Sequence, residues 1–392
     1  MLKQTMAVTA LNLKTLPSRY WSSLVIVLGV AGVVGVIVSV LALVTGLVGS
    51  IEHAGRADRA IILRGGSDTE VSSTLARDAI VTILDAPGIR RAADGQAIGS
   101  AETVMVLNRP MRSGGTDANV TLRGIGPQGL ALRPEIHLVE GRWFKPGLHE
   151  LVVGRGAQQQ FAGLDLGAHV ALRDTDWTIV GVFASDGDAH ESEILGDAET
   201  VLASYRRTLF QSVTVQLESP AALSALKDTL TTNPQLSVEV HRETDYLAKL
   251  SANLTKVMKL IAYVVGSIMA TGAVFGALNT MYSAVSARTL EITTLRAIGF
   301  GGLPIVVSVL VEALSLSLLG GILGAVLAWL FFNGHGVNAL GGNFTQLVFR
   351  LTVTPGLMIQ GIGWAMAIGS IGGLFPALRA ARLPIAAALR TL

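Results

Sequence analysis

The chain has 392 residues, of which 50% are hydrophobic and only 15% are charged, whereas about a quarter of the residues of an ordinary soluble protein are charged. The formal net charge of +2 is too small to indicate a nucleic-acid partner, and the absence of cysteine excludes a disulfide framework and thiolate metal sites. The excess of apolar residues is concentrated in four runs, each long enough to cross a membrane as a helix, which takes about 20 residues.

The first 20 residues are predicted to form an amphipathic segment. Apolar residues recur there at spacings of three and four, namely Leu2, Met6, Ala10, Leu13 and Leu16. A helix with this pattern lies in the plane of the membrane interface, with its apolar face buried and its lysines in water. A frayed polar tail is the alternative interpretation.

Four membrane-spanning helices are predicted, and they divide the chain. The apolar core of the first, at residues 21–50, is longer than the core of a secretory signal, which has about 7 to 15 residues, so we interpret it as a retained anchor. The following segments are, in chain order, a domain with helical stalks at 51–255, the second helix at 256–283, a loop at 284–304, the third helix at 305–332, a short loop at 333–354, the fourth helix at 355–378 and a tail at 379–392.

The domain at 51–255 is predicted to be α+β. Short runs rich in β-branched residues and bounded by Gly, Asp or Pro predict strands, at Leu151–Val153, His169–Leu172, Trp177–Phe183 and Ser212–Leu217. Helical patches lie between and beside them, at Thr74–Leu84, Ala157–Ala162 and Ala221–Thr231. This mixture predicts two subdomains. The flanking segments Ile51–Leu63 and Val240–Met258 are compatible with helical stalks, or with plain connectors.

Basic residues predict the orientation of the chain. They gather near the N-terminus, in the loop at 284–304 and at the C-terminus, as Lys3, Lys14, Arg19, Arg288, Arg296, Arg379, Arg382 and Arg390. Because basic residues in short segments mark the cytoplasmic side of a membrane, we expect the termini and this loop in the cytoplasm. The large domain is then extracytoplasmic.

Catalytic signatures are missing from the sequence. It contains no Gly-Lys pair for a phosphate-binding loop, no His-Glu-x-x-His and no Gly-x-Ser-x-Gly. We therefore predict no catalytic residues, no nucleotide hydrolysis by this chain and no bound metal. An acidic cluster could in principle bind a cation, but a solvated surface loop is the favoured interpretation; the cluster is Asp186, Asp188, His190, Glu191 and Glu193.

Two further features lie inside the predicted helices. Glu312 is a conspicuous carboxylate in the third helix, and intramembrane carboxylates indicate function. It lies about two turns from the cytoplasmic end, so a hydrogen-bonding role at a helix contact competes with a substrate role. The pairs Gly272 and Gly276, and Gly320 and Gly324, have the spacing that allows close helix packing, either within the chain or between two copies.

The predicted cytoplasmic loop contains a short helix. Arg288, Glu291 and Leu295 fall at helical spacing, and Gly299 follows as a C-terminal stop. A short helix with apolar side chains and flanking charges suits docking into a groove of another protein.

This loop resembles the coupling loop of the MacB/FtsX-type permeases, whose pattern is matched by Arg288, Glu291–Ile292 and Leu295–Gly299. The stretch Pro376–Arg390 resembles the family's ending, in which a proline and basic residues close the fourth helix. A third set of segments is similar in order and spacing to the family's periplasmic core domain, namely Glu140–Phe144, Glu150–Gly154, Leu164–Gly167 and Thr178–Phe183. Together these matches cover nearly the whole chain.

The sequence departs from the family pattern in two respects. Phe300–Pro304 is apolar and flexible where the family has a polar, often basic turn. The chain also lacks the nucleotide-binding domain that the MacB branch carries at its N-terminus, so the ATPase is expected on a separate subunit.

The resemblance implies the permease subunit of an ABC transporter in a bacterial inner membrane, with its large domain in the periplasm. The implied partners are two copies of a separate ATPase, a second permease copy that is identical or paralogous, membrane lipids and, in exporters, a periplasmic adaptor. No cofactor is expected in this chain, because ATP and Mg belong to the ATPase. The expected ATPase-coupling residues are Arg288, Glu291, Ile292, Leu295, Arg296, Ala297, Ile298 and Gly299.

The function that this resemblance implies is the export or extraction of hydrophobic or amphiphilic cargo, by mechanotransmission to the extracytoplasmic domain. Within the family, the alternative is a regulator that moves no cargo and activates an envelope hydrolase or a signalling partner. Outside it, the alternative is a membrane-anchored sensor or scaffold without an ATPase, in which the loop at 284–304 would be ordinary surface.

Overall fold

The computed structural model describes residues 2–14, 20–340 and 345–382, and the chain divides into two compact units. The helical unit comprises Met1–Thr45, Val257–His335 and Leu351–Leu392, and the α/β unit comprises Gly46–Lys256 and Gly336–Arg350.

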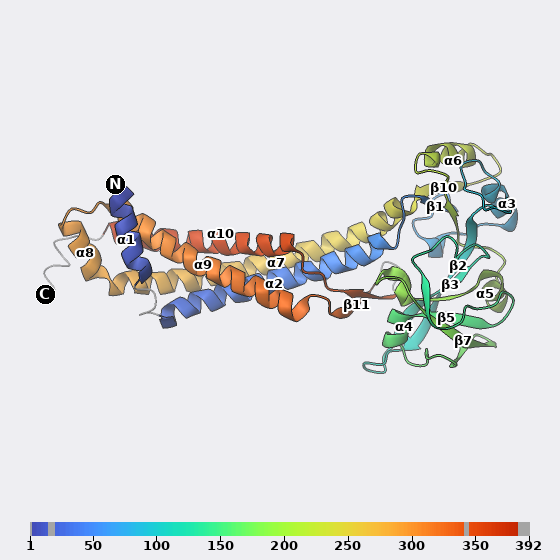
Figure 1. The fold of residues 1–392 in the computed structure, drawn as a ribbon, viewed down its shortest axis with the longest axis horizontal. Coiled ribbons are helices and arrows are strands. Elements are labelled where there is room, and N and C mark those ends of the chain that lie inside the picture. Colours follow the sequence, from blue (N-terminus) through green and yellow to red (C-terminus); the bar gives the residue numbers. More distant parts are fainter. Residues whose placement is uncertain (1, 15–19, 341–344, 383–392) are drawn as a thin grey trace. The chain divides into compact units, whose positions relative to one another are not determined.

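The helical unit is built from long apolar helices (Figure 1). Its elements are α1 (Leu2–Lys14), α2 (Tyr20–His53), α7 (Glu243–Ala287), α8 (Thr289–Ala297), α9 (Gly302–Phe332) and α10 (Pro355–Ala381), of which α2 and α7 continue into the α/β unit. Four segments are long and apolar enough to cross a membrane, at Ser23–His53, Thr255–Ala287, Gly302–Phe332 and Pro355–Ala381. The predicted fold class of four membrane-spanning helices with an α+β insertion after the first is therefore confirmed.

Small residues allow α9 to pack closely on α2. A Cβ atom added at Gly320 would stand 2.7 Å from the carbonyl oxygen of Val27, and one added at Gly324 would stand 2.4 Å from that of Ala31. Both glycines thus leave room for the backbone of a neighbouring helix. In contrast, no described atom lies within 4 Å of a Cβ added at Gly272 or Gly276 of α7. Packing within the chain accordingly involves the first pair of glycines and not the second.

Helix α10 continues past the proline that was expected to close it. Pro376 lies inside the helix, which ends at Ala381 and not at residue 378. Proline removes one backbone hydrogen bond, but the next turn is held by packing, since Ala377 and Ala380 are fully buried. Tertiary burial here outweighs the local helix-breaking tendency.

The α/β unit contains a mixed sheet of ten strands in its described residues, ordered β10-β1-β9-β2-β3-β8-β5-β7-β4, with β6 paired to β7. The strands are β1 (Arg59–Arg64), β2 (Gly99–Pro110), β3 (Asp117–Ile125), β4 (His137–Gly141), β5 (Glu150–Gly154), β6 (His169–Leu172), β7 (Thr175–Ala184), β8 (Glu193–Asp197), β9 (Ser212–Gln216) and β10 (Val238–Arg242). The helical elements are α3 (Arg77–Leu84), α4 (Arg155–Gln160), α5 (Ala198–Ser204), α6 (Ala222–Thr231) and the 3-10 turns η2 (Glu70–Ser72) and η3 (Ala189–Ser192). One sheet runs through the unit, so it joins the two predicted subdomains.

The segments expected to form helical stalks are only partly helical. Helix α2 ends at His53, and β1 occupies the second half of the predicted stalk Ile51–Leu63. The apolar run Ile61–Leu63 is buried in the sheet between β10 and β9. Burial on both faces of a central strand explains why this run is extended.

The short loop predicted at 333–354 contains a β-hairpin. Strands β11 (Gly336–Leu340) and β12 (Gln346–Arg350) pair antiparallel. The hairpin belongs to the α/β unit, where the backbone N–H of Val348 donates to Ser192 Oγ at 2.8 Å.

The acidic segment around η3 is only partly exposed, which corrects the prediction of a solvated loop. Asp186 is exposed and Glu191 and Glu193 are half-buried, but Asp188 and His190 are at most 7% exposed. The carboxylate of Glu193 accepts from Arg123 Nε at 2.9 Å, so a basic residue from another strand neutralises the cluster. Within the part of the chain that the structure describes, no group of three or more His, Asp or Glu side chains could hold a metal ion.

Arg123 is the centre of a buried ionic network in the α/β unit. Its Nη1 donates to Glu70 and to Glu102, at 2.9 Å each, and Glu102 also accepts from Arg133 at 2.7 Å. Burial opposes ionisation of Glu102, but the attraction of Arg133 and Arg123 outweighs it and holds the pKa of this carboxyl below its usual 4.5. The same balance, with Arg123 and His190 as partners, holds the pKa of Glu193 well below 4.5.

These two lowered pKa values predict that acid destabilises the α/β unit. A carboxyl whose pKa is lower in the folded state than in the unfolded state contributes stability above pH 4.5, and this contribution is lost as the pH falls below that value. We expect the urea concentration at the unfolding midpoint of the full chain to decrease as the pH is lowered below 4.5. Unfolding is followed by the fluorescence of Trp143 and Trp177, after the other three tryptophans are changed to phenylalanine. Glu102→Gln should start from a lower midpoint and lose less on acidification, whereas an equal loss in both proteins would contradict the assignment.

Candidate functional site

The candidate site is the short helix α8 together with the cavity beneath it. Glu291 lies in the first turn and Arg296 in the last turn of α8, so each charge complements the helix dipole. The helix ends at Ala297, and Gly299, two residues later, has a φ of 99° in the left-handed region that favours glycine. The N–H of Gly299 donates to the carbonyl of Arg296, and that of Phe300 to the carbonyl of Leu295, each at 3.1 Å.

Helix α8 has a buried face and an exposed face. Ile292 and Thr293 are buried, and Leu295 and Arg296 are half-buried. The exposed face carries Leu290, Glu291, Thr294, Ala297 and Ile298. Two of these are large apolar side chains, Leu290 at 47% and Ile298 at 68% exposure. Exposed apolar side chains rimmed by polar ones are typical of an interaction surface.

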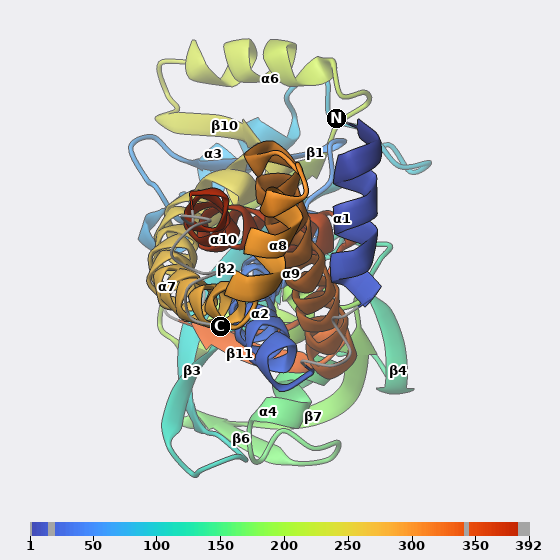
Figure 2. The same cartoon turned by 90° about the vertical axis from the view of Figure 1, so that its left-hand side faces the viewer.

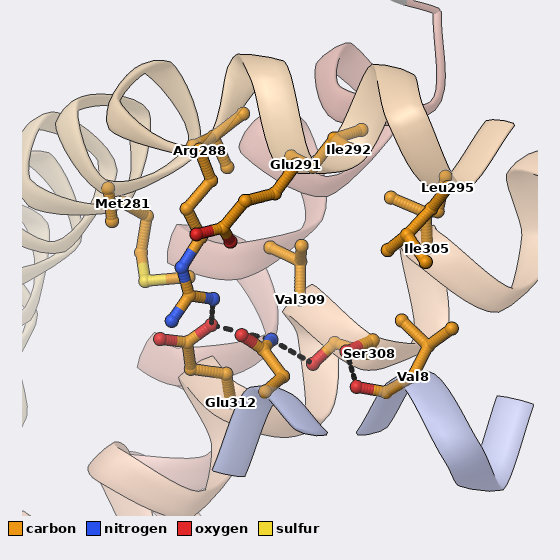
Figure 3. Close-up of a pocket in the computed structure, with 13 residues that line it drawn as sticks. Val8, Met281, Arg288, Glu291, Ile292, Leu295, Ile305, Ser308, Val309 and Glu312 are labelled. Carbon is orange, nitrogen blue, oxygen red and sulfur yellow. Dashed lines mark hydrogen bonds and ion pairs between the residues drawn. The ribbon is translucent and has the colours of Figure 1, made fainter. Parts of the chain in front are cut away.

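A buried polar cluster lies beneath α8 (Figure 3). Glu312 of α9 accepts from Arg288 Nη1 at 3.2 Å and from Asn12 Nδ2 of α1 at 2.8 Å. All three residues are less than 9% exposed. One carboxylate of α9 thus holds both the distant helix α1 and Arg288, the residue at the start of α8, and a buried carboxylate is tolerated only with such partners.

Asn12 places α1 against α9, beside which α1 lies in Figure 2. The Asn12 amide reaches the carbonyl of Ser308 at 3.4 Å, and Ser308 Oγ donates to the carbonyl of Val8 at 3.4 Å. Met6 and Ala10, which the sequence predicts on the apolar face, are exposed. The side of α1 that contacts the protein is therefore the one carrying Val8 and Asn12, and the opposite side is available to an interface.

The cavity enclosed by these helices has a volume of about 50 Å³. Ligand pockets for drug-sized molecules hold about 300–1,000 Å³, so this space suits no such ligand. Glu312 Oε2 accepts from both Arg288 and Asn12, which favours a role at a helix contact over a substrate role. The arrangement can fix the position of α8 relative to α1 and α9.

The structure brings together some of the residues predicted to act at the site. Arg288, Glu291, Ile292, Leu295 and Glu312 line the same cavity. Arg296 and Ala297 are the last two residues of α8, and Ile298 and Gly299 follow them. Arg288 and Ile292 point inward, so any coupling role they have is indirect.

Sequence reasoning missed two contributors. Asn12 is a polar residue in a segment that the sequence predicts from its apolar spacing. No local signal indicates that its side chain binds Glu312, which is 300 positions away. Leu290 was overlooked because the motif pattern begins at Arg288 and skips it. The exposure of Leu290 is the signal that identifies it.

Comparisons with known proteins cover both units. The model of the MacB-like periplasmic core domain matches residues 23–233, and that of the FtsX-like permease C-terminal region matches residues 263–385. Two similar proteins are named macrolide export ATP-binding/permease protein MacB. The protein of Bdellovibrio bacteriovorus is 25% identical over 94% of this chain and 58% of its own length. The protein of Pasteurella multocida is 28% identical over 72% of this chain and 45% of its own length. The chain thus spans about half the length of these curated relatives.

Among solved structures, the periplasmic region of MacB from Actinobacillus actinomycetemcomitans is similar over 50% of this chain and 92% of its own, with 16% identity and a TM-score of 0.37. The extracellular domain of the noncanonic ABC-type transporter YknZ from Gram-positive bacteria is similar over 47% of this chain and 99% of its own, with 18% identity and a TM-score of 0.34.

The contacts of Glu312 predict a strong coupling with Arg288. Glu312→Gln or Arg288→Gln alone leaves its buried partner uncompensated, which costs about 3–5 kcal/mol. We expect the double variant to lose much less than the sum of the two. The measurement is the free energy of opening of α8, from hydrogen exchange at the amides of Ile292 and Thr293. Thr294→Ala, on the exposed face, is the control, and additive losses would contradict the coupling.

Proposed function

Since the chain belongs to the MacB/FtsX-type permease family, whose core-domain model alone matches more than half of its residues, we propose that it is the membrane subunit of an ABC transporter driven by separate ATPase subunits. Helix α8 is the proposed docking element for the ATPase. The observation that carries this proposal is the exposed apolar face of α8 above a buried ion pair. We further propose that α8 and both termini face the cytoplasm, which the distribution of basic residues supports.

The Arg288–Glu312–Asn12 cluster makes α8 a suitable lever. Because Glu312 binds α8 and α1 to α9, a displacement of α8 by the ATPase is passed to both helices. Helix α9 in turn packs on α10 through Gly321, where a Cβ would stand 2.7 Å from that of Ala365, and through Gly373 of α10, where a Cβ would stand 2.5 Å from that of Ala313. Such close packing transmits movement because packed interiors have little free volume.

The lengths of α2 and α7 support mechanotransmission. Helix α7 has 45 residues and α2 has 34, which correspond to about 68 and about 51 Å at 1.5 Å per residue. The hydrocarbon core of a membrane is about 30 Å thick. Both helices are therefore long enough to extend beyond the membrane as continuous rods into the α/β unit.

The proposed work is the export or extraction of hydrophobic or amphiphilic cargo at the periplasmic domain. Two of the similar proteins are named as macrolide exporters. ATP and Mg are assigned to the ATPase subunit, and a periplasmic adaptor is a further proposed partner.

A second copy of the permease is the proposed partner of α7. Ile268 and Phe275 of this helix are 69% and 67% exposed, and the surroundings of Gly272 and Gly276 are open in the described structure. Glycines at this spacing allow a second helix to approach closely. Gly272 and Gly276, which have no close neighbour in the described part of this chain, would thus contact the same helix of the second copy.

The proposal predicts that changes on the exposed face of α8 release the ATPase. Co-purification of the wild-type chain with the ATPase encoded beside it is expected to give a stable complex. Ile298→Asp should weaken binding about tenfold or more, because burying an isoleucine contributes about 1.5–3 kcal/mol and 1.4 kcal/mol is a factor of ten. Glu291→Arg should impair complex formation or the coupling of ATP hydrolysis.

The matched control is Glu218→Arg, an equal charge reversal at an exposed residue of the α/β unit. It should leave ATPase binding unchanged. If the wild-type chain retains no ATPase, or if Glu291→Arg and Ile298→Asp bind as well as Glu218→Arg, the assignment of α8 is wrong and a sensor or scaffold without an ATPase gains support.

A further inference from the structure

The hairpin β11–β12 is part of the α/β unit and is linked covalently at both ends to the helical unit. The chain leaves the helical unit at His335, forms the hairpin within the α/β unit, and returns at Leu351. The base of the hairpin is closed in the helical unit, where Gly334 N donates to the carbonyl of Leu351 at 2.8 Å and Leu351 N to that of His335 at 2.9 Å. Unlike α2 and α7, which are continuous helices, the hairpin is joined to the α/β unit only by non-covalent contacts.

These contacts are close and specific. Ser192 Oγ, on a side chain only 3% exposed, accepts from Val348 N at 2.8 Å, and Phe349 is 1% exposed. A Cβ added at Gly156 would stand 3.2 Å from Val348 Cβ, and one added at Gly46 would stand 2.3 Å from the carbonyl oxygen of Arg350. Glycine at these two positions leaves space that the hairpin fills, so β12 packs closely at Val348 and Arg350.

The hairpin has closer contacts with η3 than with α7. A cavity of about 100 Å³ is lined by Leu347 of the hairpin, by Leu247 and Leu250 of α7, and by Ala189 and Ser192 of η3. Beside this cavity β12 packs on η3, whereas it has little contact with α7. A displacement of β12 is received first by Ser192, the last residue of η3.

From η3 the contacts continue to the ionic network. Glu193 follows Ser192 directly, and its carboxylate accepts from Arg123 Nε at 2.9 Å. Arg123 binds Glu70, whose backbone N–H donates to Tyr246 Oη of α7 at 3.0 Å. Arg123 is thus the point at which the path from the hairpin and the path from α7 meet.

We propose that the hairpin is a strut that stays docked on η3 throughout the transport cycle and delivers the movement of α9 and α10 to the Arg123 network, in parallel with α7. The proposal rests on the proposed function, since it requires an ATPase to move the membrane helices. It assigns Ser192, Val348 and Phe349 as positioning residues that touch no cargo and no nucleotide.

The first test removes the docking contacts. The chain contains no cysteine, so a single Lys227→Cys on the exposed surface of α6 can carry a spin label in each copy of the permease. The distance between the two labels is measured in the full complex with its ATPase, in lipid nanodiscs, with and without ATP and vanadate. Phe349→Ala and Ser192→Ala should reduce the nucleotide-dependent distance change by half or more, while ATPase binding is retained. Asn338→Ala, exposed on β11, is the matched control.

A full distance change in both docking variants would overturn the strut and leave the proposed function intact. An absence of ATPase binding and of any distance change in the wild-type chain would instead overturn the proposed function, and the strut with it.

The second test locks the hairpin and does not depend on how well Phe349→Ala folds. Ser192→Cys with Val348→Cys places two thiols on residues whose side chain and backbone are in hydrogen-bond contact, and the disulfide is verified by mass spectrometry before the assay. The rate of ATP hydrolysis and the nucleotide-dependent distance change should be equal in the oxidised and reduced forms, because the proposed strut stays docked on η3 throughout the cycle. Loss of activity on oxidation, restored by dithiothreitol, would show that the hairpin must undock and would overturn the proposal.

Discussion

The buried carboxylate of Glu312 is the constraint on which the helical unit depends. A charge inside an apolar helix packing must be compensated, and two elements far apart in the sequence, α1 and the start of α8, supply the compensation through Asn12 and Arg288. Arg288 is buried as well, so its positive charge also needs the carboxylate of Glu312 as a partner. Helix α8 consequently has one fixed face toward Glu312, and the opposite face, with Leu290 and Ile298, is left exposed.

The α/β unit uses the same principle at a different place. Arg123 is surrounded by the carboxylates of Glu70, Glu102 and Glu193, which come from three separate segments. Breaking one partner of such a cluster is far more costly than breaking a surface pair. Each unit therefore contains a buried ionic cluster whose partners come from several segments of the chain.

The parts of the structure that depend on local pattern were predictable from sequence, and those that depend on distant partners were not. Apolar runs longer than a membrane core and the stop at Gly299 follow from length and backbone conformation alone. The acidic segment around His190 was misjudged because its counter-charge, Arg123, comes from another strand. Likewise, Pro376 predicts a helix end unless the burial of Ala377 and Ala380 is known. The contact of the hairpin with Ser192 could not be predicted, because the residues of the loop itself carry no pattern that indicates it.

The most direct measurement of the central claim is site-specific photo-crosslinking from α8 in the assembled complex. A photoreactive phenylalanine derivative is placed in turn at Leu290, Ile298 and Ile292, and the adducts are identified by mass spectrometry. The account predicts adducts with the ATPase from the exposed positions Leu290 and Ile298, and adducts only within this chain from the buried Ile292. An absence of ATPase adducts at both exposed positions of an intact complex would contradict the claim that this face of α8 receives the ATPase.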